Sequence, residues 1–117
     1  MGDVVRRVQY QYVVVPDQPG EGLRVLAALQ RAGVNLLAVL GFPVEAGRAQ
    51  LDLVAEDPEA LRRVAAQEGW QLSSPKWAFL IQGEDRVGAA AEHLRRLGEA
   101  GVNVTAAAAT SAGGGRY

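Results

Sequence analysis

The residues best suited to chemistry form a short turn, Asp17-Gln18-Pro19-Gly20-Glu21. Proline fixes one backbone dihedral, and glycine lets the backbone approach a ligand or another segment closely. An apolar helical pattern follows at once, so free N–H groups at the positive end of a helix lie beside the turn. Such a place suits a carboxylate. We therefore expect the turn to bind the carboxylate of a ligand, while a plain helix-capping role for Asp17 is equally open.

A second copy of this turn runs from Asp85 to Gly88, which is 68 positions later. The tetrapeptide Ala-Gly-Val-Asn also occurs twice at this spacing. When residues 16–49 are aligned with residues 84–117, 11 of 34 positions are identical, whereas ordinary composition gives about three. The chain is therefore interpreted as a duplication, in which Val87 replaces the proline of the first turn.

The elements that must position the first turn follow from the spacing of apolar residues. The pattern predicts strands over 8–15, 36–40, 49–54 and 70–72, one helix through 23–29, and a second helix that starts at Pro58 after Asp57 and ends at Gly69. This order is βαββαβ. It predicts an α+β, ferredoxin-like fold in which two helices cover one face of a four-stranded antiparallel sheet.

The second copy is shorter than the first. Its pattern predicts a strand over 76–81, a helix that ends at Gly101, and a strand over 104–109. The copy ends where a third strand is expected. We therefore expect a complete domain over 1–74 and a partial one over 75–117, which must pack on the first domain or on another subunit.

The two turns at the ends of the first helix resemble the signature of the ACT domain family. These are Asp-x-Pro-Gly at residues 17–20 and Gly-x-Asn at residues 33–35. The resemblance covers residues 8–72 fully and residues 76–117 as a second, partial copy. It implies a tandem ACT protein that regulates by binding an amino acid between two domains.

The resemblance also implies which residues touch the ligand. Gly20 and its neighbours Gln18, Pro19 and Glu21 would hold the ligand carboxylate, and Asp17 or Asn35 would meet its ammonium group. The matching residues of the second copy are Asp85, Gly88 and Asn103. ACT domains pair with one another, so a homodimer or higher homo-oligomer is implied, with a metabolic enzyme as a possible further partner.

Composition argues against several other classes of protein. The formal net charge is −1 and the chain has no cysteine, which disfavours polyanion binding and excludes thiolate chemistry. His93 is the only histidine, and we expect it on a helix surface without a metal. No catalytic constellation, metal site or cofactor motif is found, so a non-enzyme is predicted.

Two further expectations concern location and an alternative function. Neither a signal peptide nor an apolar run of about 18 residues is found, so we expect a cytoplasmic protein without membrane contact. An RNA-binding sheet would need aromatic and basic residues on its third strand, but residues 49–54 read Ala-Gln-Leu-Asp-Leu-Val. The remaining alternative is an assembly module that pairs subunits and binds no ligand.

Overall fold

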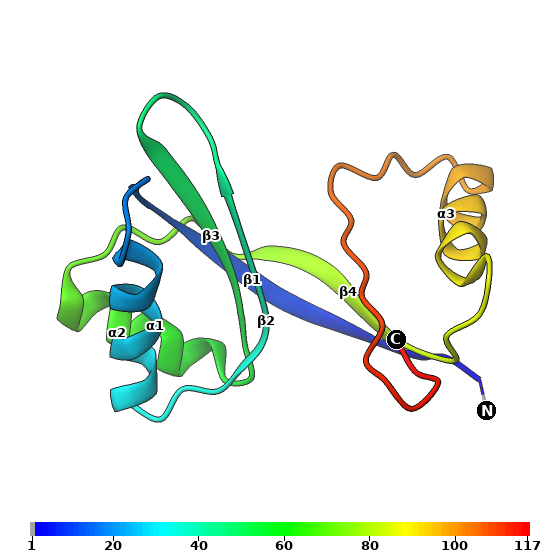
Figure 1. Cartoon of the computed structure of the whole chain (residues 1–117), viewed down its shortest axis with the longest axis horizontal. Helices are drawn as coiled ribbons and strands as arrows, with labels where there is room; N and C mark the ends of the chain where they lie inside the picture. Colours follow the sequence, from blue (N-terminus) through cyan, green and yellow to red (C-terminus); the bar gives the residue numbers. More distant parts are fainter. Residues whose placement is uncertain (1) are drawn as a thin grey trace. The chain divides into compact units, whose positions relative to one another are not determined.

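The computed structural model describes residues 2–117. The elements are, in order, β1 (Val4–Pro16), α1 (Glu21–Arg31), β2 (Leu36–Pro43), β3 (Arg48–Ala55), α2 (Pro58–Glu68), β4 (Lys76–Gln82) and α3 (Ala89–Glu99) (Figure 1). The four strands form one sheet in the order β2-β3-β1-β4. Both β1 and β2 pair antiparallel with β3. The predicted α+β fold with a ferredoxin-like antiparallel sheet is confirmed.

The fourth strand differs from the prediction. Residues 70–72 are not a strand, and the strand that completes the sheet is β4, which was expected to open the second copy. After α2 the chain contacts β1 at Ser73, whose amide donates to the carbonyl of Tyr12 at 2.9 Å. Residues 70–72 could offer only three residues to a neighbouring strand, whereas β4 has seven residues, of which five are apolar.

Residue contacts divide the chain into two compact units. Residues 7–78 form the larger unit, and residues 1–6 with residues 79–117 form the smaller unit. The expected division into tandem domains, 1–74 and 75–117, stays a prediction.

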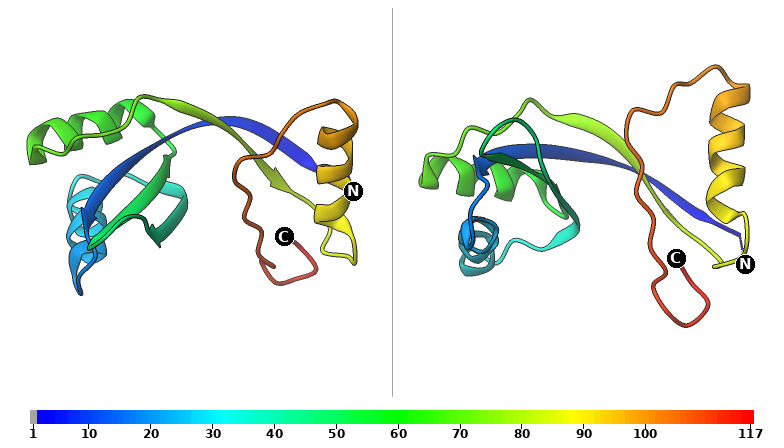
Figure 2. Two further views of the ribbon diagram at one scale, coloured as in Figure 1. Left: turned by 90° about the horizontal axis from the view of Figure 1, so that it is seen from above. Right: turned by 45° about the horizontal axis from the view of Figure 1, so that its top comes forward.

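The core of the larger unit lies between its strands and the helices α1 and α2, which lie on the same side of the sheet (Figure 2). Val25 and Leu29 of α1 and Leu61 of α2 are at most 1% exposed, as is Leu53 of β3. Val13 of β1 joins the same cluster. Alternate residues of each strand thus meet the apolar stripe of each helix, as the periodicity predicts.

The ends of α2 are confirmed in detail. The carboxylate of Asp57 accepts hydrogen bonds from the amides of Glu59 at 3.1 Å and Ala60 at 3.4 Å, and Pro58 occupies the first turn. Gly69 ends the helix with a φ of 74°, a conformation that glycine adopts without a steric penalty.

The smaller unit contains α3 followed by a long irregular segment. The predicted strand over 104–109 is wrong, because these residues have no regular structure. The segment is rich in alanine, which has a low strand propensity, and a strand forms only beside a partner strand. Further on, isolated bridges link Arg116 to Glu84 and to Gly113. None of the described helices is long and apolar enough to span a membrane.

Candidate functional site

The first predicted turn leads into α1 through Gly20. Gly20 has a φ of 88° and is the residue that precedes the helix, which has no side-chain cap among the described residues. The capping role considered for Asp17 is therefore wrong. The amide of Asp17 instead donates to the carbonyl of Gly47 at 2.9 Å. The turn is thus held by backbone contacts, and the uncapped first turn of α1 keeps N–H groups for a ligand.

The second turn has the same backbone geometry. Gly88 precedes α3 with a φ of 86°, again without a side-chain cap. The amide of Asp85 donates to the carbonyl of Gly115 at 2.9 Å. Gly115 stands 68 positions after Gly47, as Asp85 does after Asp17. The two turns are therefore held in the same way, which supports the predicted duplication.

A hollow of about 420 Å³ opens beside the second turn, within the smaller unit. It is lined by Asp85, Arg86 and Gly88, by the small side chains of residues 89–91 in the first turn of α3, by residues 109–111, and by Tyr117. The carboxylate of Asp85 accepts a hydrogen bond from the hydroxyl of Ser111 at 2.9 Å. An acidic group and a helix N-terminus thus border the same space.

The charges differ between the two turns. In the first turn Glu21 places a carboxylate at the start of α1, and this carboxylate pairs with Arg24 at 2.8 Å. Ala89 stands at the matching place in α3, and Arg86 stands where the first turn has Gln18. Glu84 stands where the first turn has Pro16, and Glu92 stands where α1 has Arg24, so acidic and basic side chains lie near both turns.

Arg86 is itself paired. Its guanidinium donates to the carboxylate of Glu92 at 2.7 Å, and Arg96 reaches the same carboxylate at 3.1 Å. The hydrogen bond and charge of Arg86, followed by the charge of Arg96, lower the pKa of Glu92. The same partner raises the pKa of Arg86. Arg86, which lines the hollow, is thus held by an ion pair with Glu92.

The two predicted asparagines lie in the Gly-x-Asn turns that follow the helices, and not beside Gly20 and Gly88. Asn35 follows the far end of α1, where its side chain donates to the carboxylate of Glu56 at 2.7 Å. The 11 residues of α1 separate it from Gly20, which corresponds to about 16 Å. Asn103 follows α3 in the same way. Within one chain Asn35 thus lies away from Gly20, and the contact of Asn35 or Asn103 with a ligand bound between two domains stays a prediction.

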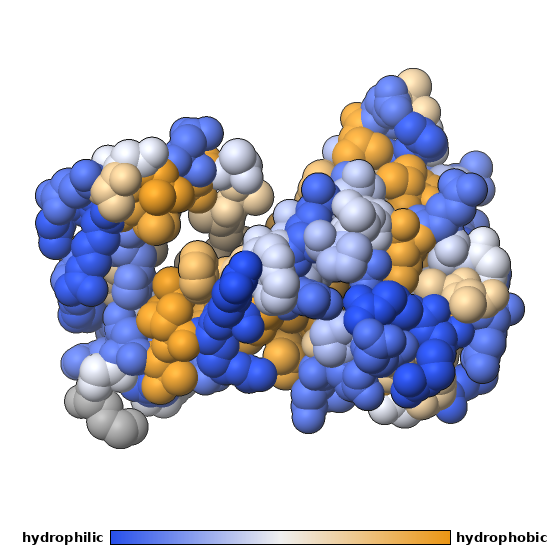
Figure 3. Space-filling view, turned by 180° about the vertical axis from the view of Figure 1, so that it is seen from behind, coloured by the Kyte–Doolittle hydropathy of each residue, from blue (hydrophilic) through white to orange (hydrophobic). Residues whose placement is uncertain are grey.

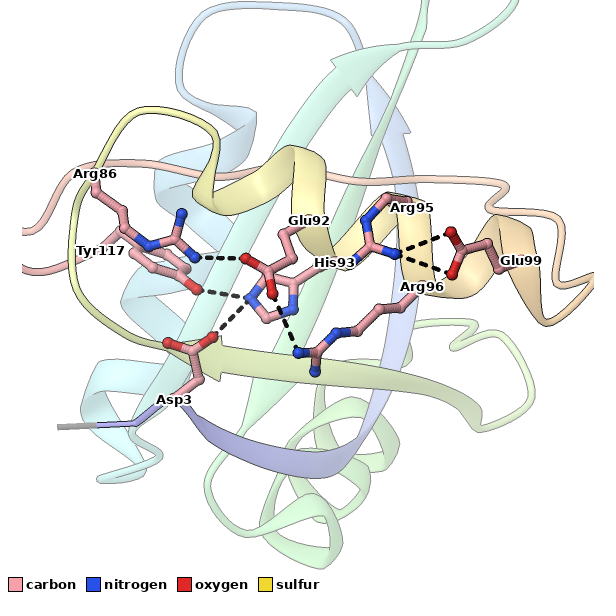
Figure 4. A network of polar contacts seen from close by, with 8 residues as sticks. All are labelled: Asp3, Arg86, Glu92, His93, Arg95, Arg96, Glu99 and Tyr117. Carbon is pink, nitrogen blue, oxygen red and sulfur yellow. Dashed lines mark hydrogen bonds and ion pairs between the residues drawn. The ribbon is translucent and has the colours of Figure 1, made fainter.

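His93 lies on α3, but it is less exposed than the predicted helix-surface residue. Its side chain is 20% exposed, and its Nε2 lies 3.0 Å from a carboxylate oxygen of Asp3. The same nitrogen lies 2.8 Å from the hydroxyl of Tyr117. Figure 4 shows the three side chains directed toward one another. Sequence reasoning missed this cluster because its members come from three segments far apart in the chain.

Comparison with solved structures shows which proteins share this architecture. The crystal structure of aspartokinase alpha and beta subunits has a TM-score of 0.69 at 17% identity, with 94% of this chain and 81% of that chain covered. The regulatory subunit of aspartate kinase from Thermus flavus has a TM-score of 0.68 at 21% identity, with 94% and 82% covered. The chain shares the fold of aspartate kinase regulatory subunits.

Protein BT0572 from Bacteroides thetaiotaomicron has this fold as well, with a TM-score of 0.71 at 16% identity, 87% of this chain and 69% of that chain being covered. No family model and no curated protein sequence matches the chain. The fold of the aspartate kinase regulatory subunits is the ACT-like fold that the two sequence motifs predict. At these identities the likeness extends to the fold and no further.

Proposed function

We propose that this chain is a non-catalytic regulatory protein that binds an α-amino acid at the turns before α1 and α3. The observation that carries the proposal is that both turns present an uncapped helix N-terminus behind a glycine with positive φ, three residues after an aspartate. Such an aspartate and such a helix end are complementary to the two charged ends of an amino acid.

The hollow beside α3 indicates how a ligand would sit. The amides in the first turn of α3 would hold the carboxylate, supported by the positive charge of Arg86, and Asp85 would accept the ammonium group. Residues 89–91 are all alanine and leave room at the helix start. In the larger unit the corresponding site would be made by Asp17, Gln18, Pro19, Gly20 and Glu21. The carboxylate of Glu21 is paired with Arg24 there.

A binding role explains the contacts of the polar groups around the hollow better than catalysis does. Ser111 donates to Asp85, but His93, the only histidine, contacts Asp3 and Tyr117 instead. A serine needs a general base held by a third group to act as a nucleophile. The described residues supply hydrogen bonds and charges for recognition, without such an arrangement.

The apolar surface of the larger unit supports the predicted homodimer. Four large apolar residues of the β2–β3 hairpin remain between 37% and 45% exposed, namely Val39, Leu40, Phe42 and Val44. Figure 3 shows apolar side chains at the surface of this hairpin. Exposed apolar patches of this kind mark contacts between proteins. A second copy, or the enzyme that the chain regulates, would cover them.

The same surface favours one alternative, an assembly module that binds no ligand. A thermal-shift screen of the twenty common amino acids separates the two functions. A ligand present at about 100 times its dissociation constant stabilises the folded state by about 2.7 kcal/mol. We expect at least one amino acid to raise the melting temperature, and no rise with any of them would support the assembly module.

Two variants locate the site once a stabilising amino acid is found. Asp85→Asn and Asp17→Asn keep the size of the side chain but remove the charge that would meet the ammonium group. We expect Asp85→Asn to reduce the thermal shift more, because the hollow lies beside that turn. Glu99→Gln is the matched control, since Glu99 lies at the far end of α3 and pairs with Arg95. An equal thermal shift in all three variants would count against both sites.

A further inference from the structure

A short loop near the end of the chain has the same backbone hydrogen bonds as the loop between β2 and β3. In the larger unit the amide of Val44 donates to the carbonyl of Arg48 at 3.0 Å, and the amide of Arg48 donates to the carbonyl of Glu45 at 2.9 Å. Residues 112–116 repeat both bonds 68 positions later, at 2.7 Å and 3.1 Å. The loop of the smaller unit is therefore fixed by its own backbone.

This loop holds Ser111 against Asp85. Ser111 directly precedes the loop, and the amide of Asp85 donates to the carbonyl of Gly115 within it at 2.9 Å. The hydroxyl of Ser111 donates to a carboxylate oxygen of Asp85, also at 2.9 Å. Both residues line the hollow beside α3. The backbone of the loop thus places a hydroxyl and a carboxylate together at the edge of this hollow.

The residue that matches Ser111 in the larger unit is Pro43. Proline has no hydroxyl and no backbone N–H. The amide of Asp17 makes the equivalent contact with the carbonyl of Gly47, so this aspartate lies beside the same kind of loop without a hydroxyl partner at that position. The pair of Asp85 and Ser111 therefore distinguishes the second turn from the first.

We propose that Ser111 is a specificity-determining residue of the second turn, which binds the ammonium group of the amino acid together with Asp85. The inference rests on the proposed function, because it assigns a further contact to the same ligand. Ser111 would favour a primary ammonium group, which has several N–H donors, over an alkylated nitrogen that has only one.

The hydrogen-bonding capacity of the hydroxyl carries this step. A serine hydroxyl has one donor and two acceptor lone pairs. Because the donor is used by the carboxylate of Asp85, the lone pairs remain for a ligand. A primary ammonium group has three donors and no acceptor, so it can donate to the carboxylate and to the hydroxyl at once. Hydrogen bonds from a charged donor are stronger than those between neutral groups.

A competing role for Ser111 predicts the opposite effect. If the hydroxyl stood where the ammonium group binds, its removal would strengthen ligand binding. The hydrogen bond from Ser111 ends on Oδ2 of Asp85, and a carboxylate accepts at both of its oxygens. Both residues are exposed, so a ligand reaches them from solvent. We therefore expect the hydroxyl to assist binding.

NMR titrations of the full chain with glycine and N,N-dimethylglycine test the inference, with the amide of Gly88 as the reporter. At equal charge, the nitrogen of glycine carries three N–H donors and that of N,N-dimethylglycine carries one. We expect the unaltered chain to bind glycine severalfold more tightly than N,N-dimethylglycine, and Ser111→Ala to reduce this preference severalfold. An unchanged preference in Ser111→Ala, or tighter binding of glycine, would overturn the inference.

Two further variants separate ligand contact from a merely structural role. Ser111→Thr keeps a hydroxyl and should retain the preference for glycine. Thr110→Val is the matched control, because Thr110 lines the same hollow but its hydroxyl donates to the backbone carbonyl of Ser111 at 3.4 Å. It should also retain the preference. Loss of the preference in all three variants would mean that the segment is disturbed as a whole, and would contradict the proposal.

The amide of Gly20 distinguishes failure of the inference from failure of the proposed function. It reports on the first turn, where Pro43 stands in place of Ser111. If glycine perturbs Gly20 but not Gly88, the inference fails while binding at the first turn stands. If no amino acid perturbs either amide, the proposed function fails and the inference fails with it.

Discussion

Gly83 and Tyr117 exchange two backbone hydrogen bonds, in which the amide of Gly83 donates at 3.2 Å and the amide of Tyr117 donates at 3.0 Å. Their counterparts 68 positions earlier, Val15 and Ala49, are paired residues of β1 and β3. Tyr117 thus occupies the place of Ala49, the second residue of β3, in the larger unit. The pairing supports the predicted duplication and explains how Tyr117 is held beside the hollow.

The positive φ of Gly20 gives a first prediction. Gly20→Ala should lower the free energy of unfolding by about 1–2 kcal/mol, because a side chain is disfavoured in the left-handed region. Gly22→Ala, within α1, should raise it by about 0.4–1 kcal/mol. An added Cβ meets nothing within 4 Å at either position, so the contrast isolates the backbone effect. Denaturant unfolding measures it, and changes of the same sign would contradict the assignment.

The core of the larger unit gives a second prediction. Leu29→Ala should lower the free energy of unfolding by about 2–5 kcal/mol, because it leaves a cavity at a site that is 1% exposed. Leu97→Ala, 68 positions later on α3, removes the same atoms from a partly buried site, and should cost less. Chemical denaturation of the two variants compares the sites. An equal loss would mean that α3 is packed as tightly as α1.

The pair between Glu92 and Arg86 gives a prediction at acidic pH. Because Arg86 lowers the pKa of Glu92 below its ordinary value of 4.5, the pair stabilises the folded state above that value. The stabilisation is lost as the pH falls through the lower folded pKa. The difference in unfolding free energy between the unaltered chain and Glu92→Gln should therefore shrink on acidification.

Glu99→Gln is the control for this comparison, because it removes an exposed carboxylate from the same helix. Urea titrations at a series of pH values measure the difference for both variants. A gap between the unaltered chain and Glu92→Gln that stays constant on acidification would show that the pair does not contribute. Exposed ion pairs contribute little to the free energy of unfolding, so we expect a small change in the difference between the two chains.

Tyr117 gives a prediction at alkaline pH. Partial burial, followed by the charge and hydrogen bond of Asp3, raises the pKa of Tyr117 above its ordinary value of 10.0. Because the pKa of Tyr117 is higher in the folded state than in the unfolded state, protonated Tyr117 stabilises the folded state fully below the ordinary pKa. This stabilisation is lost as the pH rises through the pKa of the folded state. Ultraviolet absorbance of tyrosinate should show a late component that Tyr117→Phe removes.

Asp3→Asn refines the alkaline measurement. Since the negative charge of Asp3 is one cause of the raised value, its removal should shift the late component to lower pH without abolishing it. The chain has three tyrosines, and the other two serve as internal references. A late component that does not move in Asp3→Asn would leave burial as the whole cause.

The sequence by itself determined the local features of this protein. The turns at Gly20 and Gly88, the cap at Asp57 and the helix ends follow from residue types, because these conformations depend on neighbours within a few positions. The same is true of the alternation in β1 and β3. Together these features predicted the ferredoxin-like class and the two candidate turns.

Only the tertiary structure decided which distant segments meet. It made β4 the fourth strand of the sheet in place of residues 70–72, and it left residues 104–109 without a strand. It also brought Asp3, His93 and Tyr117 together. Strand pairing and side-chain clusters depend on contacts between residues far apart in the chain, and no local pattern encodes which partner a segment finds.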